Sequence, residues 1–80
     1  MNYHKEMTKN LTRVSKNDFV EMIGRQVFDS RSGLWFTVED VYLSFLNKKV
    51  VGILTSDEYC CYDSYGEEEL NEIEFYCKGE

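Results

Sequence analysis

The feature that most constrains this sequence is the apolar stretch Val50-Val51-Gly52-Ile53-Leu54, which follows Lys49 and precedes a cluster of turn-forming residues. Its β-branched residues favour a strand, and its nearly continuous apolar character predicts burial on both faces. The stretch is far shorter than the ~20 apolar residues that a membrane-spanning helix needs. A chain of 80 residues has room for one core. We therefore expect residues 49–54 to form a central strand of one small domain.

Turn-forming clusters divide the rest of the chain into short segments with the composition of strands. The clusters are rich in Asp, Ser and Gly, which bond to their own backbone or tolerate unusual φ angles. Between them, aromatic and β-branched residues predict strands, the first two of which make a hairpin over 25–38. The clusters are 29–33, 55–58 and 63–66; besides 49–54, the expected strands are 25–29, 34–38, 59–62 and 73–77, and one helical turn is expected at 67–71.

The N-terminal third predicts one short helix. Ser15 or Asn17 can cap its start, and apolar residues between positions 19 and 23 supply a side that can be buried. Gly24 can end the helix by adopting a positive φ. Residues 1–14 are polar and lack sustained periodicity. We therefore expect a loosely ordered segment over 1–14 and a single globular domain over 15–80.

Residues 38–47 fit two structures. Five apolar residues spaced i, i+3, i+4, i+7 and i+8 from Val38 form a helical stripe, yet the segment alternates like a strand if a bulge lies at Glu39–Asp40. As a strand, it predicts a sheet that curls into an SH3-like barrel; as a helix, it predicts an α+β layer. In both cases the fold class is α+β and mainly β: a small antiparallel sheet of four to five strands with a short N-terminal helix.

The net charge of −6 is concentrated at one end of the chain. Residues 1–31 carry +2, residues 32–56 are neutral and residues 57–80 carry −8, with four tyrosines interleaved among the acidic residues of this last segment. Tyrosine is enriched at binding hot spots, and fixed carboxylates steer a partner of opposite charge. The segment therefore predicts either a binding surface for a basic protein or a solvated face that keeps a small domain soluble.

The candidate partner-binding residues are acidic and tyrosine side chains of this segment. Tyr62 and Tyr65 are the candidate anchors, and the acidic residues at 68, 69 and 72 are expected to be exposed. The expected partner is a protein with a basic surface, such as a nucleic-acid-binding protein. The full set is Asp57, Glu58, Tyr62, Asp63, Tyr65, Glu67, Glu68, Glu69 and Glu72.

No pattern in the sequence predicts an enzyme, a cofactor or a metal site. His4, the one histidine, lies in the polar N-terminal segment, which gives no support to a Cys–His pair or a Ser–His–Asp triad. The three cysteines lack the paired spacing of zinc ligands. Tyr59 and Cys61 occupy positions at which a calcium loop needs oxygen ligands. The glycines that punctuate the chain are isolated and form no phosphate-binding loop.

The expected compartment is the cytoplasm. The N-terminus is polar and has no hydrophobic signal segment, and an odd number of cysteines, with Cys60 next to Cys61, predicts reduced thiols. Direct nucleic-acid binding is not expected, because the positive residues are spread over the first third and are not grouped on one face. Membrane binding is not expected either.

Small size, an acidic tyrosine-rich segment and a missing active-site motif resemble the phage-encoded inhibitor proteins that bind host enzymes or defence complexes, some by imitating DNA. The segment 51–57, Val-Gly-Ile-Leu-Thr-Ser-Asp, is similar to a strand and turn of phage uracil-DNA glycosylase inhibitors. The rest of the chain does not match, so no inhibitory residue carries over. The resemblance implies a non-enzymatic inhibitor or modulator that acts through its acidic C-terminal face. The strand spacing also resembles SH3-like barrels, which implies, as the alternative, a module that binds a peptide or serves as a subunit of a larger assembly.

Overall fold

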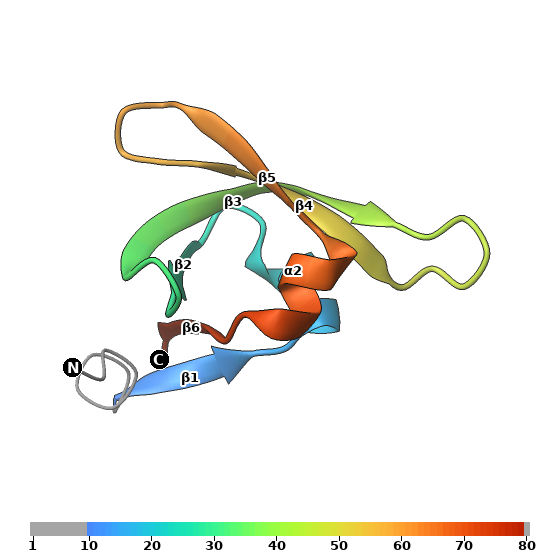
Figure 1. Ribbon diagram of the computed structural model, residues 1–80, viewed down its shortest axis with the longest axis horizontal. Coiled ribbons are helices and arrows are strands. Elements are labelled where there is room, and N and C mark those ends of the chain that lie inside the picture. The colour runs from blue at the N-terminus through green and yellow to red at the C-terminus, as the bar shows by residue number, and fades with distance from the viewer. Residues whose placement is uncertain (1–9, 80) are drawn as a thin grey trace.

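The computed structural model describes residues 10–79, which form a six-stranded antiparallel sheet curled around one core (Figure 1). In chain order the elements are β1 (Leu11–Val14), the 3-10 helix η1 (Lys16–Met22), β2 (Gln26–Asp29), β3 (Leu34–Leu43), β4 (Val50–Ser56), β5 (Tyr62–Gly66), α2 (Glu67–Glu72) and β6 (Phe75–Lys78). The mainly β, antiparallel character expected from the sequence is confirmed. The expected number of strands, four to five, is wrong because β1 adds a sixth.

A four-strand meander and a returning strand make up most of the sheet. β2, β3, β4 and β5 are neighbours in sequence and in space, and α2 then carries the chain across so that β6 pairs with β2. β1 pairs with the other side of β6. In Figure 1, β1 and β6 lie below the core, β3, β4 and β5 lie above it, and α2 lies between them. The sheet therefore wraps around its own interior, and β1 and β5 form its two edges.

The long strand β3 decides between the two structures that residues 38–47 can adopt. It pairs with β2 on one side and β4 on the other, and its register with β4 shifts between Val38 and Asp40, where the sequence pattern required a bulge. A helical stripe would have buried Phe45 and Leu46, but both side chains are exposed beyond the end of the strand. Backbone pairing on both sides of β3 thus prevails over the helical spacing of its apolar residues.

The core lies on the inner face of the curled sheet. Val50 and Ile53 of β4 are almost fully buried, as expected for the central apolar stretch. Phe75 of β6 packs edge-on against the ring of Phe19 from η1, with the centroids 5.3 Å apart. The buried cluster contains Val14, Phe19, Met22, Val27, Phe36, Val38, Val50, Ile53, Leu70, Ile73, Phe75 and Cys77.

The N-terminal third differs from expectation in two places. The predicted helix takes the 3-10 form in η1, where the carboxylate of Asp18 accepts a hydrogen bond from the backbone N–H of Ser15 (3.0 Å). It ends before Gly24, whose φ of +86° fits the predicted stop. The expected loose segment is wrong for Leu11–Val14, which form β1 because β6 supplies a pairing partner; residues 1–9 lie outside the described part of the chain. Neither helical segment of residues 10–79 has the length and apolar composition needed to cross a lipid bilayer.

The strand after β4 begins later than the sequence indicated. Residues 57–61 form the turn and β5 covers Tyr62–Gly66, so the predicted strand at 59–62 and the predicted turn at 63–66 are both wrong. The Asp57 carboxylate accepts the backbone N–H groups of Tyr59 (2.8 Å) and Cys61 (3.0 Å), which holds both residues in the turn. The later start places Tyr65 opposite Ile53, on the core side of the sheet.

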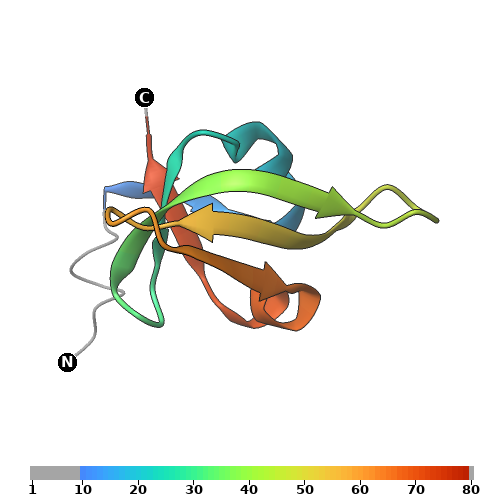
Figure 2. The same cartoon turned by 90° about the horizontal axis from the view of Figure 1, so that it is seen from above.

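The β3–β4 hairpin extends beyond the rest of the molecule (Figure 2). It accounts for the elongated shape, which measures 39 Å along its longest axis against 26 and 25 Å across. The β2–β3 and β4–β5 turns lie at the opposite end of this axis. One end of the molecule is therefore a single projecting hairpin, and the other end is formed by two turns that lie against the body of the sheet.

Candidate functional site

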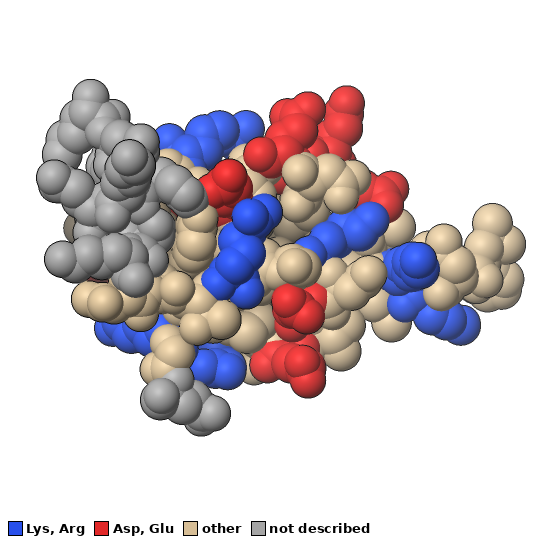
Figure 3. All heavy atoms as spheres, turned by 90° about the horizontal axis from the view of Figure 1, so that it is seen from below, with Lys and Arg blue, Asp and Glu red and all other residues tan. Residues whose placement is uncertain are grey.

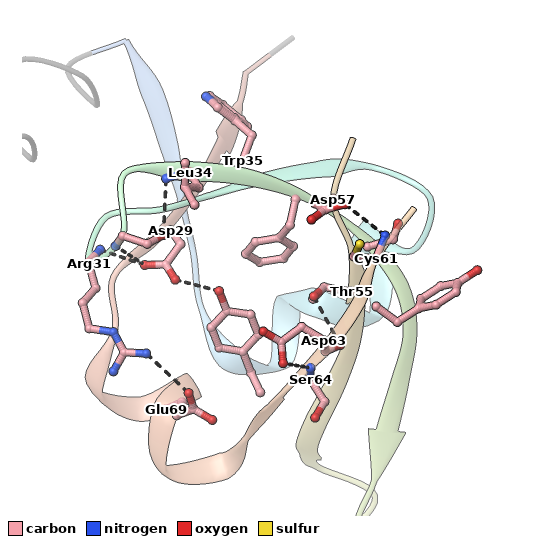
Figure 4. A pocket seen from close by; sticks show the side chains of 15 residues that line it. Asp29, Arg31, Leu34, Trp35, Thr55, Asp57, Cys61, Asp63, Ser64 and Glu69 are labelled. Atoms are coloured by element: carbon pink, nitrogen blue, oxygen red, sulfur yellow. Dashed lines mark hydrogen bonds and ion pairs between the residues drawn. The ribbon is translucent and has the colours of Figure 1, made fainter. Parts of the chain in front are cut away.

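A groove of about 400 Å³ opens at the end of the molecule that lies away from the β3–β4 hairpin (Figure 4). The β2–β3 turn, the β4–β5 turn and α2 form its rim, and β5 runs between the last two. Its lining combines charged and aromatic side chains. They are Asp29, Arg31, Asp57, Asp63 and Glu69 on the charged side, and Trp35, Phe36, Tyr62 and Tyr65 on the aromatic side.

Asp29, the last residue of β2, places a buried carboxylate in one wall of the groove. Its Oδ1 accepts hydrogen bonds from the backbone N–H groups of Arg31 (2.7 Å) and Ser32 (3.1 Å). Its Oδ2 accepts a hydrogen bond from the hydroxyl of Tyr65 (2.6 Å). A buried carboxylate is tolerated only when its oxygens are satisfied. Asp29 therefore shapes the β2–β3 turn and ties that turn to β5.

Tyr65 belongs to the core as much as to the groove. Its ring packs against Phe36 and Phe75, with centroid distances of 5.3 Å to each. Burial, reinforced by the hydrogen bond to Asp29 and by the negative charge of that carboxylate, raises the pKa of the Tyr65 hydroxyl well above its ordinary range. The hydroxyl is therefore a neutral donor at physiological pH. Tyr65 forms the floor of the groove rather than a projecting anchor.

The β4–β5 turn forms the opposite rim. Asp57 closes it through the two hydrogen bonds described above, and a backbone bond from Cys60 N–H to the Asp57 carbonyl (3.1 Å) completes it. Cys60 adopts a φ of +62°, which is uncommon for a residue with a side chain. Cys60 and Cys61 are exposed on this turn, whereas the third free cysteine, Cys77, is buried in β6.

Carboxylates also close the outer edge of β5. The backbone N–H of Ser64 donates to the Asp63 carboxylate (2.8 Å), and the N–H of Gly66 donates to the Glu69 carboxylate (3.2 Å). Unpaired N–H groups on an edge strand are a template for another strand, and natural proteins cover them. Part of the acidity of this segment therefore protects the edge of the sheet.

Basic residues from the N-terminal third neutralise two of the α2 carboxylates. Lys16 Nζ lies 2.8 Å from Glu67, and Arg31 Nη2 lies 3.4 Å from Glu69. On the face drawn in Figure 3, Lys and Arg atoms accordingly lie between groups of Asp and Glu atoms. The excess of negative charge that is local in the sequence is thus partly balanced in space.

The structure brings together about half of the predicted partner-binding residues. Asp57, Tyr62, Asp63, Tyr65 and Glu69 line the groove. The other four lie outside it: Glu58 on the β4–β5 turn, and Glu67, Glu68 and Glu72 on α2. On α2, positions 68 and 72 are exposed as expected, but position 69 is half-buried, so the expectation of exposure is wrong there.

Sequence reasoning missed the residues that the N-terminal half contributes to the groove. The sequence predicts a turn for Asp29 and Arg31 and a strand for Trp35 and Phe36, but no local pattern indicates that either segment lies beside the acidic residues. Tyr65 is separated from Asp29 by 36 positions. The turn cluster at 29–33 is a signal that could have identified these residues. Binding residues often lie on loops held by a rigid scaffold, and this turn carries charged residues next to an aromatic strand.

The side chains that line the groove determine which contacts it can offer. In the described part of the chain, no three His, Cys, Asp or Glu side chains come together in a way that could hold a metal ion. The Tyr65 hydroxyl donates a hydrogen bond to the buried carboxylate of Asp29, which also accepts a backbone N–H of the adjacent turn. The carboxylates and aromatic faces around them offer contacts to a cationic, partly apolar ligand.

Comparisons with protein-family models, with curated proteins and with solved structures found no match. The groove is therefore interpreted from its own geometry. Two of its properties matter most: its carboxylates outnumber its cationic side chains, and its aromatic residues come from two strands, β3 and β5, that are not neighbours in the sheet.

Proposed function

We propose that this chain is a non-enzymatic protein-binding domain with an SH3-like barrel, whose groove receives a basic, partly apolar segment of a partner protein. The barrel is supported by the strand order: the meander β2 to β5, one helical element and the return of β6 to β2. The bulge in β3 helps such a sheet to bend around its core. In this interpretation β1 is an extra strand at one edge of the sheet and is not part of the SH3-like barrel.

The observation that carries the proposal is the excess of carboxylates in the groove. Four carboxylates and one guanidinium line it, and Asp29 is fully used by the fold. Asp57 and Asp63 each accept backbone hydrogen bonds at Oδ1, which leaves Oδ2 of each without a partner among residues 10–79. A lysine or arginine side chain that enters the groove can meet these oxygens.

An exposed aromatic ring stands beside these carboxylates. Tyr62, the first residue of β5, is 67% exposed, so its face is open to a ligand. A cation over an aromatic face gains ~0.5–1 kcal/mol at exposed sites, and an interface tyrosine that acts as a hot spot contributes ~2 kcal/mol or more. Tyr62 is therefore the anchor in this proposal, and the carboxylates select a basic partner.

The inhibitor role expected from the acidic segment stays a prediction. The inhibitor role and the groove proposal both require a basic partner surface. They differ in which part of this chain makes the contact. An acidic ridge along α2 would need its carboxylates unpaired, whereas Glu67 and Glu69 are paired with Lys16 and Arg31. Ion pairs at an exposed surface contribute little to stability, but they lower the field that an approaching partner meets.

The test is a nuclear magnetic resonance titration with a short synthetic peptide of alternating lysine and leucine. The expected shifts lie at the backbone of Tyr62 and of the β4–β5 turn. Binding should weaken as salt rises, since the screening length falls to ~8 Å at physiological ionic strength. A peptide with glutamate in place of lysine should not bind.

Two double variants separate the groove from general acidity. Asp57→Asn with Asp63→Asn removes two groove charges but keeps each Oδ1 acceptor, so the turn and the strand edge should hold. This variant should lose affinity about tenfold, or about 1.4 kcal/mol. The matched control, Glu68→Gln with Glu72→Gln, removes the same charge from exposed positions of α2 and should change affinity little. Equal losses in the two variants would contradict a groove site.

A further inference from the structure

The tip of the β3–β4 hairpin presents two large apolar side chains to solvent. Phe45 is 89% exposed and Leu46 is 92% exposed, the highest values among the large hydrophobic residues of the described chain. Lys48 and Lys49 follow after Asn47, and the Lys48 ammonium lies 5.5 Å from the centroid of the Phe45 ring. In Figure 3 the hairpin ends in uncharged atoms, with Lys and Arg atoms behind them. The tip therefore presents apolar side chains at its end and positively charged side chains just behind them.

Hydrogen bonds within the turn hold this tip in one shape. The backbone N–H of Ser44 donates to the Lys49 carbonyl (2.7 Å), and the N–H of Lys48 donates to the Ser44 carbonyl (2.9 Å). The Ser44 hydroxyl accepts the N–H of Leu46 (3.2 Å), and the Asn47 side chain accepts the N–H of Lys49 (3.0 Å). The exposure of the two apolar side chains thus comes from an ordered turn. An ordered apolar projection is typical of an interaction site.

The same chain carries a surface that complements this tip. The groove at the other end of the molecule has aromatic walls and an excess of carboxylates, as described above. Its volume of about 400 Å³ is within the ~300–1,000 Å³ of pockets that take an organic group of this size. Phe45 or Leu46 fits its aromatic side, and Lys48 and Lys49 match the carboxylates of Asp57 and Asp63.

We propose that the hairpin tip of one copy docks into the groove of a second copy, so that the chain self-associates head to tail. The inference rests on the proposed function, because it names a second copy of this chain as the source of the basic, partly apolar segment. Tip and groove lie at opposite ends of the long axis (Figure 2). When two copies meet end to end along this axis, one tip and one groove of the pair stay free. Such a heterologous contact continues into a ring or an open chain.

A lipid surface is the main competing occupant for the tip. Two apolar residues followed by two lysines also suit an anionic membrane. The net charge of −6 opposes approach of the molecule to such a surface, whereas the groove of a second copy attracts the tip locally. The charge distribution therefore favours the second copy.

Two variants that each disable one contact provide the test. The tip variant is Phe45→Ser with Leu46→Ser, which leaves the backbone bonds of the turn in place. The groove variant is Asp57→Asn, Tyr62→Ser and Asp63→Asn. Sedimentation velocity on the full chain, from micromolar to millimolar concentration at low salt, measures association. Amide spectra of each variant show that it is folded.

The expected pattern is specific to a heterologous contact. The wild-type chain should form species larger than a dimer as concentration rises, and added salt should reverse this. Each variant alone should stay monomeric. A mixture of the two should form a dimer of one copy of each and nothing larger, because only one intact tip and one intact groove remain.

Three outcomes would overturn the proposal: a wild-type chain that stays monomeric, a tip variant that associates like the wild type, or a mixture that forms no dimer. If the wild-type chain is monomeric but sediments with phosphatidylglycerol vesicles in a tip-dependent way, the tip is a lipid contact. If the wild-type groove binds the lysine–leucine peptide while the chain stays monomeric, the self-association fails and the groove function stands. If neither peptide nor second copy binds, both fail.

Discussion

The groove end and the hairpin end of this molecule use the same kinds of residue for opposite purposes. At the groove end, Phe36 and Tyr65 are packed into the core and the carboxylate of Asp29 has three donors. At the hairpin end, Phe45 and Leu46 project into solvent from a well-bonded turn. Both ends are ordered, but only the groove end is connected to the core.

The difference teaches that apolarity does not decide burial in a small sheet. A strand that extends beyond the helical elements packed on its inner face carries its side chains into solvent, whether they are apolar or polar. β3 and β4 pair beyond the region that η1 and α2 cover, as the views in Figures 1 and 2 show. The side chains of this overhang are available for contacts, whereas those of the groove end determine stability.

The largest expected effect compares one phenylalanine from the core with one from the tip. Phe75→Ala removes a ring that contacts Phe19, Phe36 and Tyr65, and should cost ~3–5 kcal/mol, comparable to the whole stability of a small domain. Phe45→Ala should change the free energy of unfolding by no more than about 0.5 kcal/mol. Urea denaturation measures both. A cost above about 1 kcal/mol at Phe45 would show that the hairpin tip is part of the core after all.

A second comparison concerns two carboxylates that each shape a turn beside the groove. Asp29→Ala leaves three part-buried donors without their acceptor and should cost ~1–3 kcal/mol. Asp57→Ala removes two hydrogen bonds that water can replace, and should cost ~0.5–1.5 kcal/mol. The two variants can be ranked by their denaturation midpoints. The reverse ranking would mean that the β4–β5 turn, not the Asp29 corner, holds the groove together.

The hydroxyl of Tyr65 predicts a dependence on alkaline pH. Its pKa in the folded chain is raised above the ordinary ~10, so its contribution to stability is complete below pH ~10 and is lost as pH rises through the folded value. Tyr65→Phe should be less stable than the wild type by ~1 kcal/mol at neutral pH. The difference should shrink as pH rises above ~10. Denaturation curves at a series of pH values test this, and a constant difference would exclude a titrating Tyr65.

The smallest expected effect concerns the thiols, two of which lie on the groove rim. Cys60 and Cys61 are exposed and should react at once with a thiol reagent, whereas Cys77 is buried and should react only on unfolding. A reducing agent should leave the melting temperature unchanged. Mass spectrometry after brief labelling counts the modified thiols. Three fast thiols would show that β6 opens readily and that the groove end is less rigid than its contacts indicate.

Local chemistry made several parts of this fold predictable. The β-branched stretch 50–54, the hairpin around 29–33, the stop at Gly24 and the helical turn at 67–71 each depend on residues close in sequence. The bulge that a strand interpretation of β3 required could also be placed, because the alternation in the sequence breaks at Glu39–Asp40, where the first of two register shifts with β4 lies. Tertiary pairing decided whether that strand formed.

The groove could be predicted only in part, for the same reason. The acidic, tyrosine-bearing rim is a property of residues 57–69 and is visible in the sequence. The wall made by Asp29 and Phe36 is not, because it depends on the curl of the sheet bringing β2 and β3 over β5.

By itself, the sequence determined which segments favour strands, where the turn at 29–33 falls and which third of the chain is acidic, because propensity, turn chemistry and charge act over a few residues. The tertiary structure alone decided that Leu11–Val14 become an edge strand, that Tyr65 turns inward while Phe45 stays out, and that Lys16 and Arg31 neutralise part of the acidic face. These outcomes require contacts between residues tens of positions apart. Such contacts form only when the whole sheet closes around one core.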